Sequence, residues 1–169
     1  SNLTDLALRA GDLAAAESHA GHAIEVATAS GNRAVLSWAK TKVASLAVRR
    51  GDNDAARSAL AEGLSVALEL GSPSLKFYAV ESFAELLSAQ GEVSCARRVL
   101  TYAADHPTAS APVRDEIRRR LETLPAVVNA TPAWPGLELD DLLHRIVVES
   151  NVAHAPLIAT LRGELVGSA

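Results

Sequence analysis

The stretch GDNDAARSAL, residues 51–60, decides the fold of this chain, because altered copies of it recur along the sequence. The stretches that begin at residues 11 and 91 read GDLAAAESHA and GEVSCARRVL, so a glycine followed by an acidic residue returns every 40 residues. Gly31-Asn32 and Gly71-Ser72 fall midway between these points. A fixed period of this length is typical of repeat architectures. The sequence therefore predicts an array of about three repeats.

Each repeat is predicted to contain two helices. Glycine is the usual residue just past a helix end, where a positive φ is needed, and the polar residue after it can cap the next helix. Two glycine points in each period therefore divide a repeat into two antiparallel helices of about 15–17 residues.

Matched apolar residues support the alignment of the repeats. Their spacing of three or four residues is that of one helix face. Small residues recur where helices must approach closely, and larger aliphatic residues recur where space must be filled. The matched sets are Ala16/Ala56/Ala96, Ala20/Leu60/Leu100, Ala23/Gly63/Ala103, Ala39/Ala79, Ala44/Ala84, Leu46/Leu86 and Ala47/Leu87.

The composition excludes several classes of protein. The 169 residues are 49% hydrophobic and only 4% aromatic, with a net charge of -4, one Cys and no Met. No apolar run approaches the ~20 residues that span a bilayer. One Cys can form neither an internal disulfide nor a Cys-rich zinc site, and an acidic balance argues against nucleic-acid binding. We therefore expect neither a cofactor nor a metal, and no membrane or direct nucleic-acid contact.

The repeat pattern decays after residue 105. A loop over 106–112 precedes a predicted closing helix that runs to about residue 123, with Val113, Ile117, Leu121 and Leu124 on one stripe. The predicted domains are thus a repeat array with its closing helix over 1–124, a proline-rich linker over 125–136 and a helical tail over 137–169. Within the tail we expect a helix over 137–148 and a second one over 156–166.

The first helix of the array is short. Residues 6–9, LALR, match residues 46–49, LAVR, but little chain precedes them. Ser1-Asn2 is typical of a cleaved tag, and no initiator Met is present. We expect a fragment with further repeats upstream; the alternative is a natural chain with a short capping helix.

The pattern Gly-Asp-x-x-x-Ala, with a further Ala seven residues later, resembles the tetratricopeptide repeat. The period of 40 exceeds the ~34 residues of that repeat and is similar to the longer repeats of the maltose-regulator type. Residues 97–108, RRVLTYAADHPT, and 133–141, AWPGLELDD, are similar to the last repeat and the C-terminal tail of such proteins.

This resemblance implies a right-handed superhelix that serves a large, cytoplasmic bacterial regulator. Such regulators join a nucleotide-binding signalling ATPase to a repeat array, often with a DNA-binding domain of the LuxR or antibiotic-regulator type. No Gly-Lys-Ser/Thr phosphate loop is present in this chain, so we assign no nucleotide chemistry to it.

The resemblance also implies a concave binding face, lined by the first helix of each pair. Trp38 and Tyr78 lie one period apart on this face, as do Arg9 and Arg49. An aromatic ring with a polar atom is a good anchor for a partner, and an arginine can pair with a carboxylate. The alternative is that the rings fill gaps beside alanines and the arginines are solvated. The predicted binding residues are Arg9, Trp38, Thr41, Ser45, Arg49, Tyr78, Glu81 and Glu85.

Other reactive side chains are interpreted as structural. His19 and His22 are three residues apart, close to a zinc-ligand spacing, but without a third ligand they are better explained as exposed helix residues. Cys95 is predicted to be a packed thiol, and Arg118 to Arg120 to belong to a salt-bridged helix surface.

The favoured function is protein interaction and ligand sensing, in which binding changes how the array docks on another domain of the same regulator. The alternative is a stand-alone scaffold that docks peptides or assembles a complex without a switch. An enzyme is a third and weaker hypothesis, since no nucleophile with its base is found. A homodimer is also expected, through apolar helix surface at the truncated end.

Overall fold

The computed structural model describes residues 3–126, 138–149 and 155–162, and this part of the chain contains helices and no strand. The predicted all-α fold is therefore confirmed. The helices are α1 (Leu3–Ala10), α2 (Leu13–Ser30), α3 (Arg33–Arg49), α4 (Asn53–Glu69), α5 (Pro73–Ala89), α6 (Val93–Asp105), α7 (Ala111–Thr123), α8 (Leu139–Val148) and α9 (Ala155–Arg162).

The helix ends lie where the glycine pattern predicts them. The glycines at 11, 31, 51, 71 and 91 all have positive φ, between 61° and 85°, a conformation that other residues rarely adopt. Asp12, Asn32 and Asp52 then accept hydrogen bonds from backbone N–H groups three residues later, at 2.9 to 3.1 Å. Ser72 and Glu92, the residues that follow the next two glycines, make no such side-chain bond.

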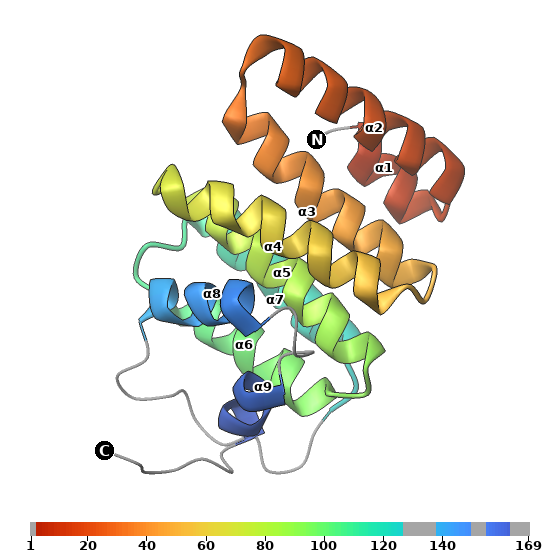
Figure 1. Cartoon of the computed structure of the whole chain (residues 1–169). Helices are drawn as coiled ribbons and strands as arrows, with labels where there is room; N and C mark the ends of the chain where they lie inside the picture. Colours follow the sequence, from red (N-terminus) through yellow and green to blue (C-terminus); the bar gives the residue numbers. More distant parts are fainter. Residues whose placement is uncertain (1–2, 127–137, 150–154, 163–169) are drawn as a thin grey trace.

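The first seven helices pack in sequence, each against the next (Figure 1). The odd-numbered helices also contact one another in order, α1 with α3, α3 with α5 and α5 with α7. The largest fully buried side chains include Phe77 and Phe83 of α5, Leu64 of α4 and Leu100 of α6, and helices α7 to α9 contribute others. The odd-numbered helices thus form one continuous layer.

Gly63 in α4 explains how closely α3 and α4 pack. A Cβ atom at this position would lie 2.9 Å from the backbone O of Ser37 and 3.1 Å from Cγ2 of Thr41. Instead the Ser37 hydroxyl donates a hydrogen bond of 2.7 Å to the Gly63 carbonyl. The small residue predicted for this position is required by the close approach of two backbones.

The closing helix α7 buries the predicted stripe. Ile117 is fully buried, and Val113, Leu121 and Leu124 are partly buried against the same core. Pro112 lies in the first turn of α7. Backbone N–H groups in that turn make no hydrogen bond within the helix, so the lack of an N–H in proline costs nothing there.

The tail helices pack on the even-numbered helices, α8 on α4 and α9 on α6 (Figure 1). Lys76 Nζ lies 2.6 Å from an Asp140 carboxylate oxygen, and Arg162 pairs with Glu92. Besides these ion pairs, the tail shares one apolar core with the array. Its buried residues are Leu139, Leu142, Leu143, Ile146, Leu157 and Leu161.

Several predicted features lie outside the described residues. These are Ser1-Asn2, the linker apart from residues 125 and 126, position 137 and the end of the second tail helix beyond residue 162.

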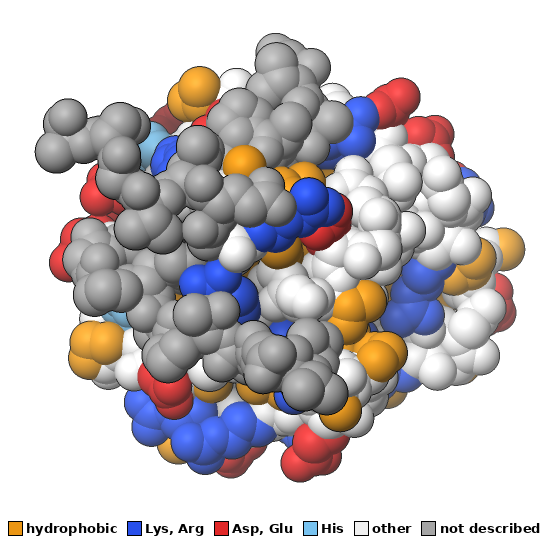
Figure 2. Space-filling model, turned by 90° about the horizontal axis from the view of Figure 1, so that it is seen from below, with side chains coloured by type: hydrophobic (Ala, Val, Ile, Leu, Met, Phe, Trp, Pro, Cys, Tyr) orange, Lys and Arg blue, Asp and Glu red, His pale blue; other side chains and the backbone are white. Residues whose placement is uncertain are grey.

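In the described parts of the chain, none of the helices combines the length and apolar composition that a membrane crossing requires. On the face shown in Figure 2, basic and acidic side chains lie next to one another rather than in separate areas. This intermixing agrees with the many ion pairs between neighbouring helices.

Candidate functional site

The odd-numbered helices enclose a groove of about 350 Å³, which we call the odd-helix groove. Helices α1, α3, α5 and α7 all contribute side chains to it, and eight of these side chains are charged. The lining residues are Asp5, Leu8, Arg9, Lys42, Ser45, Tyr78, Glu81, Glu85, Pro112, Val113, Glu116, Arg119 and Arg120.

Ion pairs between different helices tie most of these charges together. Lys42 of α3 lies 2.9 Å from Asp5 of α1, and Arg120 of α7 pairs with Glu85 of α5. Glu116 accepts from Arg9 at 3.4 Å, which joins α7 to α1.

Within α7 itself, Glu116 also pairs with Arg119, at 2.7 Å. The guanidinium groups of Arg9 and Arg119 are more than half exposed, so these two cations remain hydrated.

Glu81 is the exception among the charged lining residues. Within the described residues, its carboxylate has neither an ion pair nor a hydrogen bond. Burial raises the pKa of Glu81 to about 7, while the nearby charges of Lys42 and Arg120 oppose this rise. Near neutral pH the groove therefore contains a carboxyl group that is poised between its neutral and ionised forms.

A polar contact between α3 and α5 lies behind the groove. The hydroxyl oxygens of Ser45 and Ser82 are 3.3 Å apart, and the Ser82 hydroxyl donates to the Thr41 carbonyl at 3.2 Å. Ser45 is only 5% exposed, so it lines the groove as a fixed wall.

Aromatic rings hold the Lys42 ammonium in place. Its Nζ lies 5.4 Å from the ring centre of Tyr78 and 5.8 Å from that of Trp38, within the range of a cation–π interaction. Tyr78 lines the groove, whereas Trp38 packs against the core behind Lys42.

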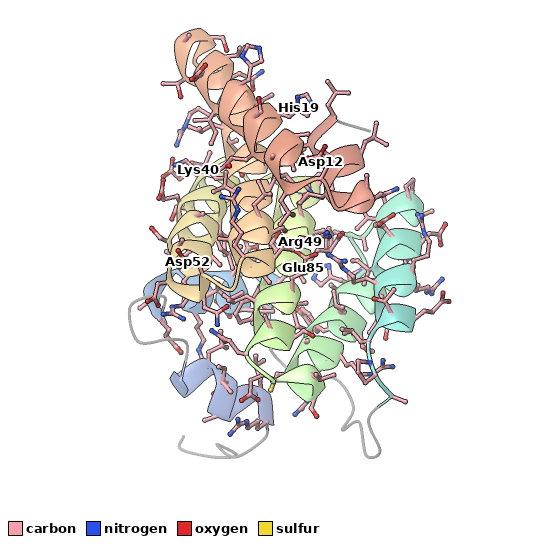
Figure 3. All side chains as sticks on the ribbon, turned by 90° about the vertical axis from the view of Figure 1, so that its right-hand side faces the viewer. Asp12, His19, Lys40, Arg49, Asp52 and Glu85 are labelled. Atoms are coloured by element: carbon pink, nitrogen blue, oxygen red, sulfur yellow. The ribbon has the colours of Figure 1, made fainter. Side chains whose placement is uncertain are left out.

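A second hollow of about 290 Å³, which we call the apolar side pocket, adjoins the groove. Glu85 and Arg120 line both hollows, so their ion pair forms the wall between them. Arg49 also lines the side pocket, and its guanidinium donates a hydrogen bond of 2.7 Å to the Leu8 carbonyl in the last turn of α1. In Figure 3, Arg49 and Glu85 lie on the side of α3 and α5 that faces α7.

The structure brings most of the predicted binding residues together, but not all. Those that line the odd-helix groove are Arg9, Ser45, Tyr78, Glu81 and Glu85. Arg49 lines the side pocket instead.

Thr41 is predicted to be an accessible binding residue, but in the structure it is completely buried. Its hydroxyl donates to the Trp38 carbonyl at 2.7 Å, and its methyl group packs beside Gly63 of α4. Trp38 is half-buried against the core, which agrees with the packing alternative for this ring.

Sequence reasoning missed Lys42 and the three charged residues of α7, whereas it places Asp5 on the binding face together with Arg9. On α3 the predicted face is right at Ser45 and Arg49, but one turn earlier Lys42 and not Thr41 enters the groove. The sequence signal for Lys42 is its position between Trp38 and Tyr78, two aromatic residues that lie one period apart.

The sequence predicts Arg119 and Arg120 of α7 only as part of a salt-bridged helix surface, because Glu116 and Glu122 flank them. Their ion pairs with Glu116 and Glu85 lie in the groove.

The other residues with reactive side chains lie in surroundings that suit a structural role. Cys95 is buried, and burial together with the charge of Glu92 raises the pKa of its thiol to about 11. This value keeps the thiol protonated and inert. His22 is exposed and His19 half-buried on α2, and in Figure 3 His19 lies far from Arg49 and Glu85. The described residues hold no group of three or more His, Cys, Asp or Glu side chains suited to a metal ion.

The fold and the groove together define an all-α protein built of paired helices. In comparisons with known proteins, no family model, no curated protein and no solved structure matches the chain.

Proposed function

We propose that the chain is a protein-interaction and ligand-sensing helical module that binds through its odd-helix groove. The observation that carries this proposal is the convergence of eight charged side chains from four helices on one hollow of about 350 Å³. Concave sites with a few converging polar groups are the usual places of binding. The mixed charges favour a partner that is recognised by charge complementarity rather than by apolar area alone.

The proposal includes the wider context that the sequence suggests. The helix pairs are tetratricopeptide-like repeats of a right-handed solenoid, and the chain serves a large, cytoplasmic bacterial regulator. The glycine–acid pairs at 11, 51 and 91 and the stretch at 97–108 support this context by resemblance. Docking of the groove on another domain, or on a second protein, would then respond to a bound ligand.

A binding role is favoured over a catalytic one because the groove lacks an activated nucleophile. The Ser45 hydroxyl contacts the Ser82 hydroxyl and no base. Seven of the eight charged lining residues are held in ion pairs, which suits recognition and positioning more than proton transfer.

Site-specific photocrosslinking tests the proposal. A photoreactive amino acid at position 119, in the groove, should capture a partner in the native cells, whereas the same amino acid at position 33 should not. Arg33 is a suitable reference position because it is half exposed and pairs with Glu69, outside the groove.

Purified partner then gives the decisive comparison. The double variant Arg9→Glu/Arg119→Glu should weaken binding at least about tenfold, since it reverses two exposed groove charges. The double variant Arg33→Glu/Arg50→Glu makes the same change of net charge at exposed sites elsewhere and should bind normally. Equal affinities of the two variants would refute the proposal.

A ligand-sensing module and a scaffold differ in one measurable property. If the chain is a sensor, a ligand in the groove changes its affinity for the protein partner. A scaffold without a switch binds its partner equally well with and without the ligand.

A further inference from the structure

The uncompensated carboxyl group of Glu81 identifies the kind of ligand that fits the groove. The lining carries four acidic and four basic side chains. Asp5, Glu85 and Glu116 are paired with cations of the groove, and these pairs engage all four of its basic side chains. Glu81 is therefore the one acceptor in the described lining whose charge lacks a partner.

The groove's own cations are placed where they do not pair with Glu81. Lys42 is held by Asp5 at 2.9 Å and by the ring of Tyr78, while Arg120 is bound to Glu85. Arg9 and Arg119 both point to Glu116 and are well exposed. A buried carboxylate without a partner is costly, and a cation brought by a ligand would remove that cost.

A second unpartnered atom lies beside it. Glu85 Oε2 is buried and accepts no hydrogen bond in the described structure, although its other oxygen pairs with Arg120. Glu81 and Glu85 are four residues apart in α5, so they lie on one face of that helix. Two acceptors on one face suit a donor group with several N–H bonds.

The apolar side pocket supplies space for the rest of such a ligand. It adjoins the groove at Glu85 and Arg120, and Val48, Ala84, Leu100 and Leu124 provide apolar walls. With this pocket alongside, the site suits an organic cation with a short apolar body better than an inorganic ion.

We propose that the odd-helix groove binds an organic cation, a protonated amine or guanidinium with a short apolar body, whose charged group pairs with Glu81 and Glu85. This inference rests on the proposed binding function and names the chemistry of the ligand. The same cation could come from a free small molecule or from a lysine or arginine side chain of a partner, and the experiment below separates these sources.

Binding of such a cation is coupled to a proton. The groups that face Glu81 are Lys42 of α3, Arg120 and Glu116 of α7, Asp5 of α1, and Tyr78 and Glu85 of α5. With a pKa of about 7, Glu81 must lose its proton to pair with the ligand. The ionised fraction rises about tenfold between pH 6 and pH 8, and the affinity should rise by a similar factor.

The test is an NMR titration of the full chain with three probes of similar size, followed by two further cations. Butylammonium at millimolar concentration should shift the amide signals of residues that line the groove, more strongly at pH 8 than at pH 6. Butanol and butyrate, which are neutral and anionic, should cause no comparable shifts. Butylguanidinium and Nα-acetyl-lysine amide, whose ε-ammonium group stays charged, then compare a free cation with a peptide-borne one.

Two variants make the result decisive. Glu81→Gln keeps the shape of the side chain and should weaken butylammonium binding at least tenfold and abolish its pH dependence. Glu122→Gln changes an exposed carboxylate on α7 outside the groove and should bind as the wild type does. Unchanged amide signals remote from the groove would show that Glu81→Gln retains the fold.

Three results would overturn the inference. These are the absence of groove shifts with butylammonium, equal binding by Glu81→Gln, and stronger binding of butyrate to the same residues. The last result would leave the proposed binding function intact, because the groove would still take a ligand. Failure of the Arg9→Glu/Arg119→Glu test, in contrast, would remove that function itself.

Discussion

The two sides of the helix array differ in whether other helices cover them. On the even-numbered helices, α8 and α9 cover the array with leucines and an isoleucine that are at most 5% exposed. On the odd-numbered helices the groove is open, and charged side chains line it. Apolar burial stabilises the fold by the area removed from water, whereas exposed ion pairs contribute little. The covered side is therefore suited to stability and the open side to recognition.

The largest effect is expected where the tail covers the array. Leu143→Ala removes a fully buried side chain of α8 and should lower the free energy of unfolding by about 2–5 kcal/mol. Thermal unfolding monitored by circular dichroism measures this loss.

The control for this prediction is Val148→Ala in the same helix. Val148 is 76% exposed, so its truncation should cost less than about 0.5 kcal/mol. Equal losses for the two variants would show that α8 does not dock as described.

A pH-dependent effect is expected on the open side. Glu81 has a pKa of about 7 in the folded chain against an ordinary 4.5, because burial disfavours its ionised form. Its favourable contribution is full below about pH 4.5 and is lost as the pH rises through 7. Glu81→Gln should match the wild type at about pH 4 and exceed its stability by about 2–3 kcal/mol at pH 8.

Chemical denaturation at several pH values tests this difference. Glu122→Gln, which changes an exposed carboxylate, should follow the wild type at every pH. Parallel stability curves for Glu81→Gln and the wild type would contradict the placement of Glu81 in a desolvated site.

A pair of glycine substitutions compares two even-numbered helices. In Gly63→Ala the new methyl group meets the Ser37 backbone at 2.9 Å, so the variant should lose about 1–3 kcal/mol of stability. In Gly21→Ala nothing lies within 4 Å of the new atom, and the better helix propensity should add about 0.5–1 kcal/mol. Melting temperatures that move in the same direction for both would contradict the close packing of α3 and α4.

The smallest effect is expected at the helix caps. Asp52→Ala removes a hydrogen bond of 2.9 Å to the Ala55 N–H and should cost about 1 kcal/mol. Ser72 lies half a period later, at the N-cap of α5, without such a bond, so Ser72→Ala should cost less than about 0.5 kcal/mol. A larger loss for Ser72→Ala would show that the caps are assigned wrongly.

Local signals in the sequence predicted the helices well. Positive φ at Gly51 and the cap at Asp52 depend on residues close in the chain, so the sequence alone was enough to place them. The buried stripe around Ile117 was equally readable from its spacing.

The groove was only partly predictable, because it depends on contacts between distant helices. Lys42 enters it and Thr41 does not, because the Thr41 side chain is buried beside Gly63 of α4. The contribution of α7 arises from pairs such as Arg120–Glu85, whose members are 35 positions apart. No repeat pattern links those two residues.

The central claim is that the open side of the array is the binding side. The most direct test is the affinity of an identified partner for the two charge-reversed double variants. Arg9→Glu/Arg119→Glu should bind at least about tenfold more weakly than the wild type, and Arg33→Glu/Arg50→Glu should bind equally well. Equal affinities for both double variants, or a loss confined to Arg33→Glu/Arg50→Glu, would contradict the claim.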